Sequence, residues 1–224
     1  MAGLLEIACF NVESALIAAK AGAHRIEFCA DYTSGGVTPA IEDFSKVKKA
    51  VSIPVFIMVR PRPGSFYYNR EEFENLKSQI SNFKSLGADG FVLGVLDSSG
   101  CIDVARNSEL IKLANPLPCT LHRMFDETPD TLKSLEDAIT CGFARILTAG
   151  GPGNAIDNLE TLKNLVSVSG TRIGILPGGG IRNNNVKSIL QTTACNEIHS
   201  AAAIHSAPTL ANAEEIQNLV RHMV

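Results

Sequence analysis

Five ionisable residues interrupt apolar runs of this sequence, and their types are those that transfer protons or bind anions. They are Glu6, Glu27, Arg60, His122 and His199. A charge that is buried in a strand without a partner is costly, so such residues indicate either a buried ion-pair network or a functional site. Glutamate and histidine act as general acids and bases, whereas the planar guanidinium of arginine suits carboxylate and phosphate groups.

These residues lie in apolar runs that alternate with segments of helical periodicity. We predict strands over 4–10, 25–30, 54–60, 90–97, 118–126, 144–150, 172–180 and 197–203, and helices over 12–23, 41–51, 70–86, 103–114, 129–142, 154–168, 183–194 and 211–223. Repeated βα units whose strands are apolar on both faces predict a (β/α)8 TIM barrel, with an open doubly wound sheet as the alternative. No linker or composition shift divides residues 1–224, so we expect a single domain.

The first three strands are expected to direct charged side chains to one end of the barrel. Active sites of such barrels lie at the C-terminal ends of the strands. Because side chains alternate along a strand, Glu6 and Glu27 can occupy neighbouring inward columns. Arg60 and Arg62 leave the third strand two residues apart. We expect both guanidinium groups at the mouth, where they either neutralise the glutamates or hold an anionic ligand.

The fifth strand ends in a histidine that a nearby carboxylate could orient. Asp126 follows His122 by four residues, so we expect the pair to act in acid–base catalysis. The alternative is a core histidine bonded to a backbone carbonyl. With Glu6, Glu27 and His199, these two residues complete the predicted catalytic set.

Glycines and small residues follow the later strands, where barrels often bind phosphate through backbone N–H groups. The predicted ligand-binding residues are Arg60, Arg62, Arg123, Gly151, Gly178, Gly179, Gly180 and Ser200. The alternative for the glycines is a tight turn that needs positive φ. Phe66, Tyr67 and Tyr68 are expected either to form an apolar rim or to pack in a homodimer.

Composition excludes some partners and indicates a compartment. Twenty Lys and Arg against 23 Asp and Glu give a net charge of -3, which disfavours binding to nucleic acid or an anionic membrane. The first residues lack the features of a secretory signal, and no apolar run approaches the roughly 18 residues of a spanning helix. The six cysteines are scattered without zinc-finger spacing. We therefore expect a cytoplasmic protein with reduced thiols and no membrane partner.

Several motifs in one order resemble the CutC family, whose members are usually labelled copper homeostasis proteins. The matching stretches include LEIACFNVESA, AHRIEFCA, IPVFIMVRPRPGSFYY, LHRMFD, PGGGI and EIHSAAA, which run from Leu4 to about Ala203. The resemblance implies a (β/α)8 barrel, a cytoplasmic location and a role in handling Cu(I).

The copper role implied by the resemblance rests on inward cysteines of the first two strands. Cys29 matches one of them and is the predicted metal ligand, whereas Ala8 stands where relatives often have the other. Alternation directs Cys9 to the opposite face, so Met58 is either a substitute soft ligand or a plain core residue. Pro63 and Ser65 also replace residues that tend to be glycine and aspartate in relatives.

Three functions remain open from the sequence. The first is Cu(I) binding or trafficking through Cys29. The second is an enzyme in which glutamate and histidine transfer protons on a small anionic or phosphorylated metabolite. The third is a barrel without catalysis, whose polar core only stabilises the fold.

Overall fold

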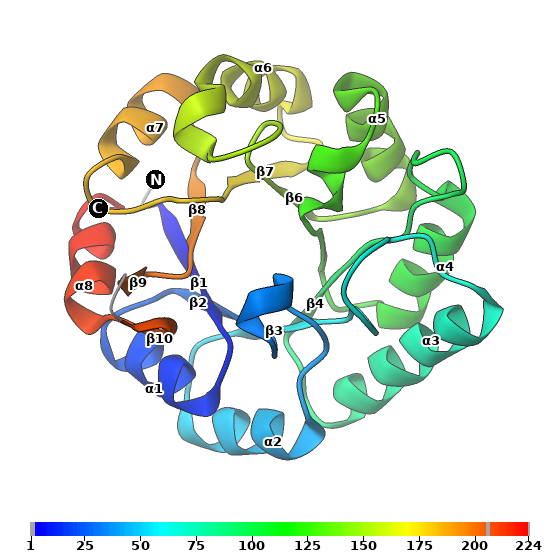
Figure 1. The fold of residues 1–224 in the computed structure, drawn as a ribbon, viewed down its shortest axis with the longest axis horizontal. Coiled ribbons are helices and arrows are strands. Elements are labelled where there is room, and N and C mark those ends of the chain that lie inside the picture. Colours follow the sequence, from blue (N-terminus) through cyan, green and yellow to red (C-terminus); the bar gives the residue numbers. More distant parts are fainter. Residues whose placement is uncertain (1–2, 205–206, 224) are drawn as a thin grey trace.

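The computed structural model describes residues 3–204 and 207–223 and consists of a ring of parallel strands surrounded by helices (Figure 1). The strands are β1 Leu4–Cys9, β2 Arg25–Phe28, β3 Val55–Met58, β4 Gly90–Leu93, β5 Cys119–Leu121, β6 Arg145–Thr148, β7 Gly174–Pro177 and β8 Glu197–Ser200. The helices are α1 Val12–Lys20, α2 Ile41–Ala50, α3 Arg70–Ser85, α4 Val104–Ala114, α5 Thr131–Cys141, α6 Leu159–Ser169, α7 Val186–Thr193 and α8 Ala213–Arg221. A short hairpin of β9 Ala203–Ile204 and β10 Ala207–Ala211 precedes α8.

Strand order confirms the predicted (β/α)8 barrel. The sheet runs β7-β6-β5-β4-β3-β2-β1-β8, and every hydrogen-bonded neighbour pair is parallel. A doubly wound sheet would reverse its order at a switch point, which this sequential order excludes. β7 and β8 lie side by side and nearly close the ring, although no ladder joins them in the part of the chain that the structure describes (Figure 1).

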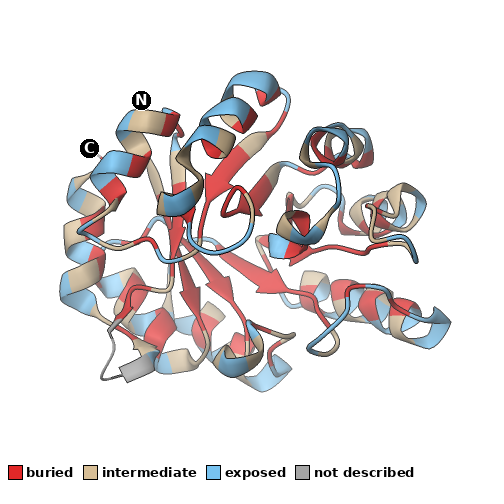
Figure 2. Ribbon diagram, turned by 45° about the horizontal axis from the view of Figure 1, so that its top comes forward, coloured by how far each residue is buried: buried red, intermediate tan, exposed pale blue. Residues whose placement is uncertain are grey.

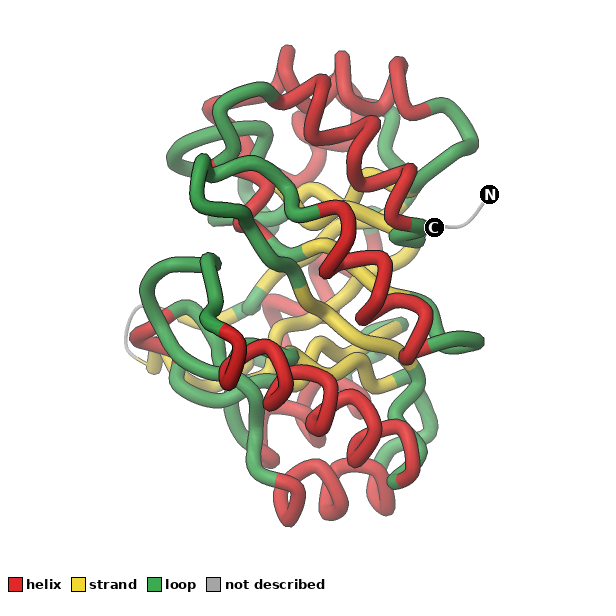
Figure 3. Tube along the Cα trace, turned by 90° about the vertical axis from the view of Figure 1, so that its right-hand side faces the viewer, coloured by secondary structure: helices red, strands yellow, loops and turns green. Residues whose placement is uncertain are grey.

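Alternation along the strands gives the barrel two apolar regions. One side of each strand packs against the helices, which lie around the strands (Figure 3) and expose their outer faces (Figure 2). The other side faces the interior, where Cys29, Phe56, Met58 and Val92 form a separate buried cluster. Cys9 belongs to the outer region and Cys29 to the inner one, as the period of two along a strand predicts.

Local sequence signals explain where the helices begin. Asn69 caps α3 through a capping box with Glu72, and Asn11 accepts a hydrogen bond from the Ser14 amide at the start of α1. The predicted fifth strand is too long: β5 ends at Leu121, because the segment Arg123–Glu127 forms a 3-10 helix, η2. Within the described ranges, no helix has the length and apolar character required to cross a membrane.

Candidate functional site

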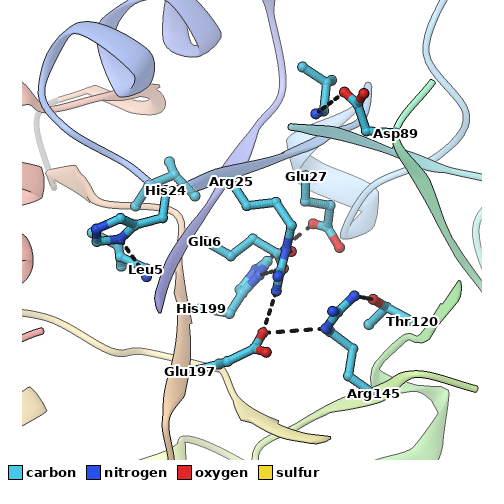
Figure 4. Close-up of polar contacts among 12 residues, drawn as sticks. Leu5, Glu6, His24, Arg25, Glu27, Asp89, Thr120, Arg145, Glu197 and His199 are labelled. Carbon is cyan, nitrogen blue, oxygen red and sulfur yellow. Dashed lines mark hydrogen bonds and ion pairs between the residues drawn. The ribbon is translucent and has the colours of Figure 1, made fainter. Parts of the chain in front are cut away.

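A buried ionic network fills the barrel interior near the N-terminal ends of the strands (Figure 4). Arg25 lies between two carboxylates, donating through Nε to Glu6 and through Nη2 to Glu197 at 2.7 Å. Arg145 lies 3.3 Å from the same Glu197 carboxylate and donates to Thr120. The network therefore balances two guanidinium groups against two carboxylates.

Strand register explains why Glu6 belongs to this network. Glu6 is level with Arg25 on β2 and with His199 on β8. Its second oxygen accepts a hydrogen bond from His199 Nδ1 at 2.7 Å. Burial raises the pKa of Glu6, but Arg25 and His199 outweigh burial and lower that pKa to about 2. Glu6 is thus an ionised carboxylate whose two oxygens are both occupied.

His199 links this network to a second carboxyl. Its Nε2 lies 3.8 Å from Glu27 Oε2. Burial lowers the pKa of His199, but the nearby Glu27 and Glu6 raise it above its usual value. Because Nδ1 donates to Glu6, the Nε2 atom is the one that faces Glu27.

Glu27 differs from Glu6 because its charge is not fully compensated. It is 3% exposed, and its Oε1 has no hydrogen-bond partner among the described residues. Burial raises the pKa of Glu27 to about 7, although His199 favours the ionised form. A buried polar atom without a partner costs about 1–3 kcal/mol, so this oxygen is available for a ligand.

Glu27 and His199 form part of the lining of a pocket of about 240 Å³ at the C-terminal ends of the strands. One wall is aromatic, with Phe10, Tyr32 and Phe66. The opposite wall is formed by residues of the later strands and their loops, namely Arg123, Leu147, Gly179, Gly180, Arg182, Ser200 and Ala201. The volume is below the roughly 300–1,000 Å³ of pockets that hold drug-sized molecules, so it suits a small ligand.

His122 also lines this pocket, but the expected Asp126–His122 pair is wrong. Asp126 accepts hydrogen bonds from Arg123, from the Thr148 hydroxyl and from the Ala149 amide instead. The reason is the turn of η2, which directs Asp126 toward β6. The alternative of a bond to a backbone carbonyl is also wrong, since His122 Nδ1 accepts from the Met124 amide at 3.4 Å.

The His122 ring is neutral and has one free nitrogen. Burial and the neighbouring Arg60 lower its pKa to about 3. Since Nδ1 is an acceptor, the proton of the neutral ring resides on Nε2. This N–H is buried and has no partner in the ranges that the structure covers, and the ring packs against Phe66 at 4.8 Å between centroids.

Of the two predicted mouth arginines, only Arg60 reaches the pocket. Its Nη1 donates to the carbonyls of Ser34 and Gly36, and its guanidinium lies 4.7 Å from the Phe66 ring centre. Arg62 turns away and pairs with Glu72 on α3, which contradicts the expectation that both arginines share the mouth. Arg60 therefore shapes the loop after β2, and Arg62 stabilises the start of α3.

The predicted glycine-rich side of the site lies partly at the pocket. Gly179 and Gly180 line the pocket, and their amides donate to no acceptor in the described part of the chain. Gly178 lies deeper, where a side chain would overlap Leu147 and crowd His199. Gly151 lines a second pocket of about 450 Å³ beside the mouth, which Arg60, Phe66 and Arg123 also line.

Ser200 and Arg182 complete this wall. The Ser200 hydroxyl donates to the Ile181 carbonyl at 2.7 Å and accepts from Arg182 Nη1 at 3.2 Å. Arg182 forms no ion pair with a described carboxylate, so its charge is available to an anion. Arg123 also lines the pocket but is paired with Asp126 at 2.9 Å.

The carboxylate and imidazole donors of the pocket do not fit a bound metal ion. Glu6, Glu27 and His199 are the one group of metal-ligating side chains that comes together in the described residues. Arg25 and His199 already occupy both oxygens of Glu6, which leaves too few free donors for a bound ion. Cys29 lies outside this group, and burial together with Glu27 raises the pKa of its thiol well above the usual range.

Four charged residues of the site were missed by the sequence-based prediction. Arg25, Arg145 and Glu197 are the first residues of their strands, a position typical of a solvent-facing strand end. The spacing of two between Arg25 and Glu27, and between Glu197 and His199, is the signal that places them on the inward face. Arg182 follows the PGGGI motif directly.

The architecture and the site define a class: a (β/α)8 barrel with a carboxyl–imidazole pocket at the C-terminal ends of its strands. The sequence model of the CutC family matches residues 3–204, and the chain belongs to the CutC family. A human protein named "Copper homeostasis protein cutC homolog" is 41% identical over 199 residues, covering 89% of this chain and 73% of the human one. A CutC protein of Xanthomonas axonopodis pv. citri is 37% identical over 198 residues, covering 88% of this chain and 82% of the bacterial one.

Solved structures agree with this assignment. The crystal structure of CutC from Streptococcus agalactiae matches with a TM-score of 0.84 and 31% identity, covering 89% of this chain and 98% of that chain. Phosphoribosyl anthranilate isomerase from Thermotoga maritima matches with a TM-score of 0.63 at 16% identity, covering 99% of this chain and 98% of the isomerase. At that identity the second match shows the shared barrel fold alone.

Proposed function

We propose that this CutC family member is an enzyme that transfers a proton on a small anionic molecule bound at the barrel mouth. The observation that carries the proposal is the Glu27 carboxyl, which is buried in the pocket and lies 3.8 Å from His199, with one oxygen unpartnered among the described residues. Tyr68 Oη and Arg145 Nε are also unpartnered among the described residues, but neither residue lines the pocket, so Glu27 is the unpartnered carboxyl that a ligand can reach.

The neighbours of Glu27 support acid–base chemistry. A general base or acid works best when its pKa lies near the operating pH, and the pKa of Glu27 is raised to about 7. Glu6 and Arg25 fix the orientation of His199 from behind. Glu27 can therefore accept or return a proton while His199 supplies positive charge beside it.

The opposite wall supports an anionic ligand. Arg182 has no carboxylate partner among the residues described, and the Gly179 and Gly180 amides are free to donate. Such amides and a guanidinium together suit a phosphate or carboxylate group.

The test measures both ligand binding and turnover in the wild-type protein and in variants. Thermal shift measurements with phosphorylated and carboxylated metabolites should give at least one stabilising compound. Arg182→Gln should remove the shift, whereas the matched control Arg62→Gln should retain it, because Arg62 points toward α3. Conversion of that compound should fall at least a hundredfold in Glu27→Gln with binding retained. A set of anions without any shift, or turnover that survives in Glu27→Gln, would contradict the proposal.

Cytoplasmic Cu(I) binding is the second candidate, and the names of the relatives favour it. Cys29 and Met58 pack together in the inner cluster, and their sulfur atoms are of the soft kind that Cu(I) prefers. All six cysteines are free, and free thiols persist in a reducing cytoplasm. An anaerobic Cu(I) competition titration should then show tight binding that is lost in Cys29→Ser. Equal affinities for the two proteins would exclude this candidate.

A further inference from the structure

His122 is a second buried group of the pocket that has no partner for its polar atom. Its Nδ1 accepts a hydrogen bond from the Met124 amide, so Nε2–H is a donor without an acceptor in the described residues. Phe66 packs against the ring at 4.8 Å and is itself in contact with the Arg60 guanidinium. The ring is thus fixed in place before any ligand binds.

We propose that His122 Nε2–H polarises a carbonyl oxygen, and that the substrate is a small anionic α-hydroxycarbonyl compound. This inference rests on the proposed function and gives it a reaction class, enolisation followed by isomerisation. The residues match the two demands of that reaction. A carboxylate must remove a proton from carbon, and a neutral donor must stabilise the negative charge that develops on the adjacent oxygen.

The reaction balances without an oxidant, reductant or co-reactant. The Glu27 carboxylate takes the proton from the carbon next to the carbonyl, and the C–H electron pair forms a carbon–carbon double bond. The carbonyl π pair moves to oxygen, where the hydrogen bond from His122 stabilises the enediolate. The neutral Glu27 carboxyl then returns the proton to the former carbonyl carbon, and the hydroxyl proton moves between the two oxygens. The product is an isomer of the substrate.

A neutral imidazole suits this role better than an imidazolium. Burial and the nearby Arg60 keep the ring neutral, since both lower its pKa. A neutral N–H is a weak acid whose hydrogen bond strengthens as the oxygen becomes an enolate. The amides of Gly179 and Gly180, which donate to no acceptor in the described chain, and the Arg182 side chain are left to hold the anionic group of the same molecule.

The first test examines the unliganded protein by NMR of histidine labelled with 15N, with His122 assigned through His122→Gln. At pH 7 we expect a neutral ring with its proton on Nε2 and none on Nδ1. A charged His122, or a proton on Nδ1, would overturn the inference even if the pocket binds anions.

The second test compares phosphoglycolohydroxamate, which mimics a phosphorylated enediolate, with ethyl phosphate, which has the phosphate but no carbonyl. The hydroxamate should bind at least tenfold more tightly, and His122→Phe should remove that difference while ethyl phosphate still binds. Circular dichroism and the melting temperature of the variant check its fold. Equal affinities in the wild-type protein would overturn the role of His122 and leave the proposed function standing. Binding of neither compound would instead count against both.

Discussion

The two ends of the barrel interior carry similar charged side chains in opposite situations. Near the N-terminal ends of the strands, Arg25 and Arg145 are paired with Glu6 and Glu197. At the mouth, Glu27 and His122 each have an unpartnered buried atom within the described chain. The first set is joined by ion pairs, although Arg145 Nε has no hydrogen-bond partner among the described residues. Glu27 and His122 differ because they line the pocket, where a ligand can reach their unpartnered atoms.

Within this polar core, the residues near the N-terminal ends of the strands stabilise the fold, and those at the mouth are available for function. A paired buried charge is costly to disrupt because its partner is left uncompensated. An unpaired buried group already destabilises the folded state, so removing it costs little or even stabilises. Substitutions at the two ends should therefore have effects of opposite sign on the free energy of unfolding.

The largest expected effect comes from Arg25→Met. This change leaves Glu6 and Glu197 without their shared cation in the barrel interior. We expect it to lower the free energy of unfolding by about 3–5 kcal/mol. Urea denaturation at pH 7 measures the loss. Arg172→Met is the control, since it breaks an exposed pair with Glu136 and should cost much less; similar losses in both variants would remove the distinction.

Glu27→Gln should act in the opposite direction. The pKa of Glu27 is raised from 4.5 to about 7, so between these pH values the folded protein binds more protons than the unfolded chain and stability falls as pH rises. Glutamine does not titrate and escapes this loss. The variant should therefore gain roughly 2–3 kcal/mol over the wild type between pH 4.5 and 8.5. Urea denaturation at several pH values measures the free energies of unfolding of both proteins. A difference between them that does not change from pH 4.5 to 8.5 would show that the charge of Glu27 does not destabilise the folded protein.

His122→Gln should change how the free energy of unfolding depends on pH below pH 6.5. The pKa of His122 falls from 6.5 to about 3 on folding, so its contribution to stability is present above pH 6.5 and is lost as pH falls toward 3. The wild type should lose about 2 kcal/mol relative to the variant between pH 6.5 and 5. Parallel stability curves for the two proteins over this range would argue against a buried neutral ring.

The smallest effect on stability is expected for Arg182→Gln. The side chain donates to the Ile181 carbonyl and the Ser200 hydroxyl but forms no ion pair with a described carboxylate. We expect a loss of less than about 1.5 kcal/mol in urea denaturation, comparable to one or two ordinary hydrogen bonds. A loss as large as that of Arg25→Met would assign Arg182 to the structural set.

The fold could be predicted because its signals are local and repeated. Eight apolar runs separated by amphipathic segments leave few alternatives to a barrel, and alternation placed Glu6, Glu27 and Cys29 on the inner face and Cys9 on the outer one. His122 and His199 also line the pocket, as expected from their places in the fifth and eighth apolar runs.

The errors concern side chains whose direction depends on contacts between distant segments. Arg62 has the spacing of a mouth residue, but Glu72 on α3 attracts it away from the barrel. Asp126 follows His122 closely, yet the 3-10 turn brings it to Thr148 on β6. Arg25 was missed because the sequence does not give the register of β1 and β2, which places the first residue of β2 level with Glu6.

A titration of the Glu27 carboxyl tests the contrast between the two ends most directly. In protein labelled with 13C at the glutamate carboxyl carbon, the Glu27 resonance is assigned through Glu27→Gln and followed from pH 3 to 9. The site described here predicts a midpoint near 7, while Glu6 stays ionised down to the lowest pH. A Glu27 midpoint close to 4.5 would contradict the account, because the mouth carboxyl would then be as well compensated as an ordinary one.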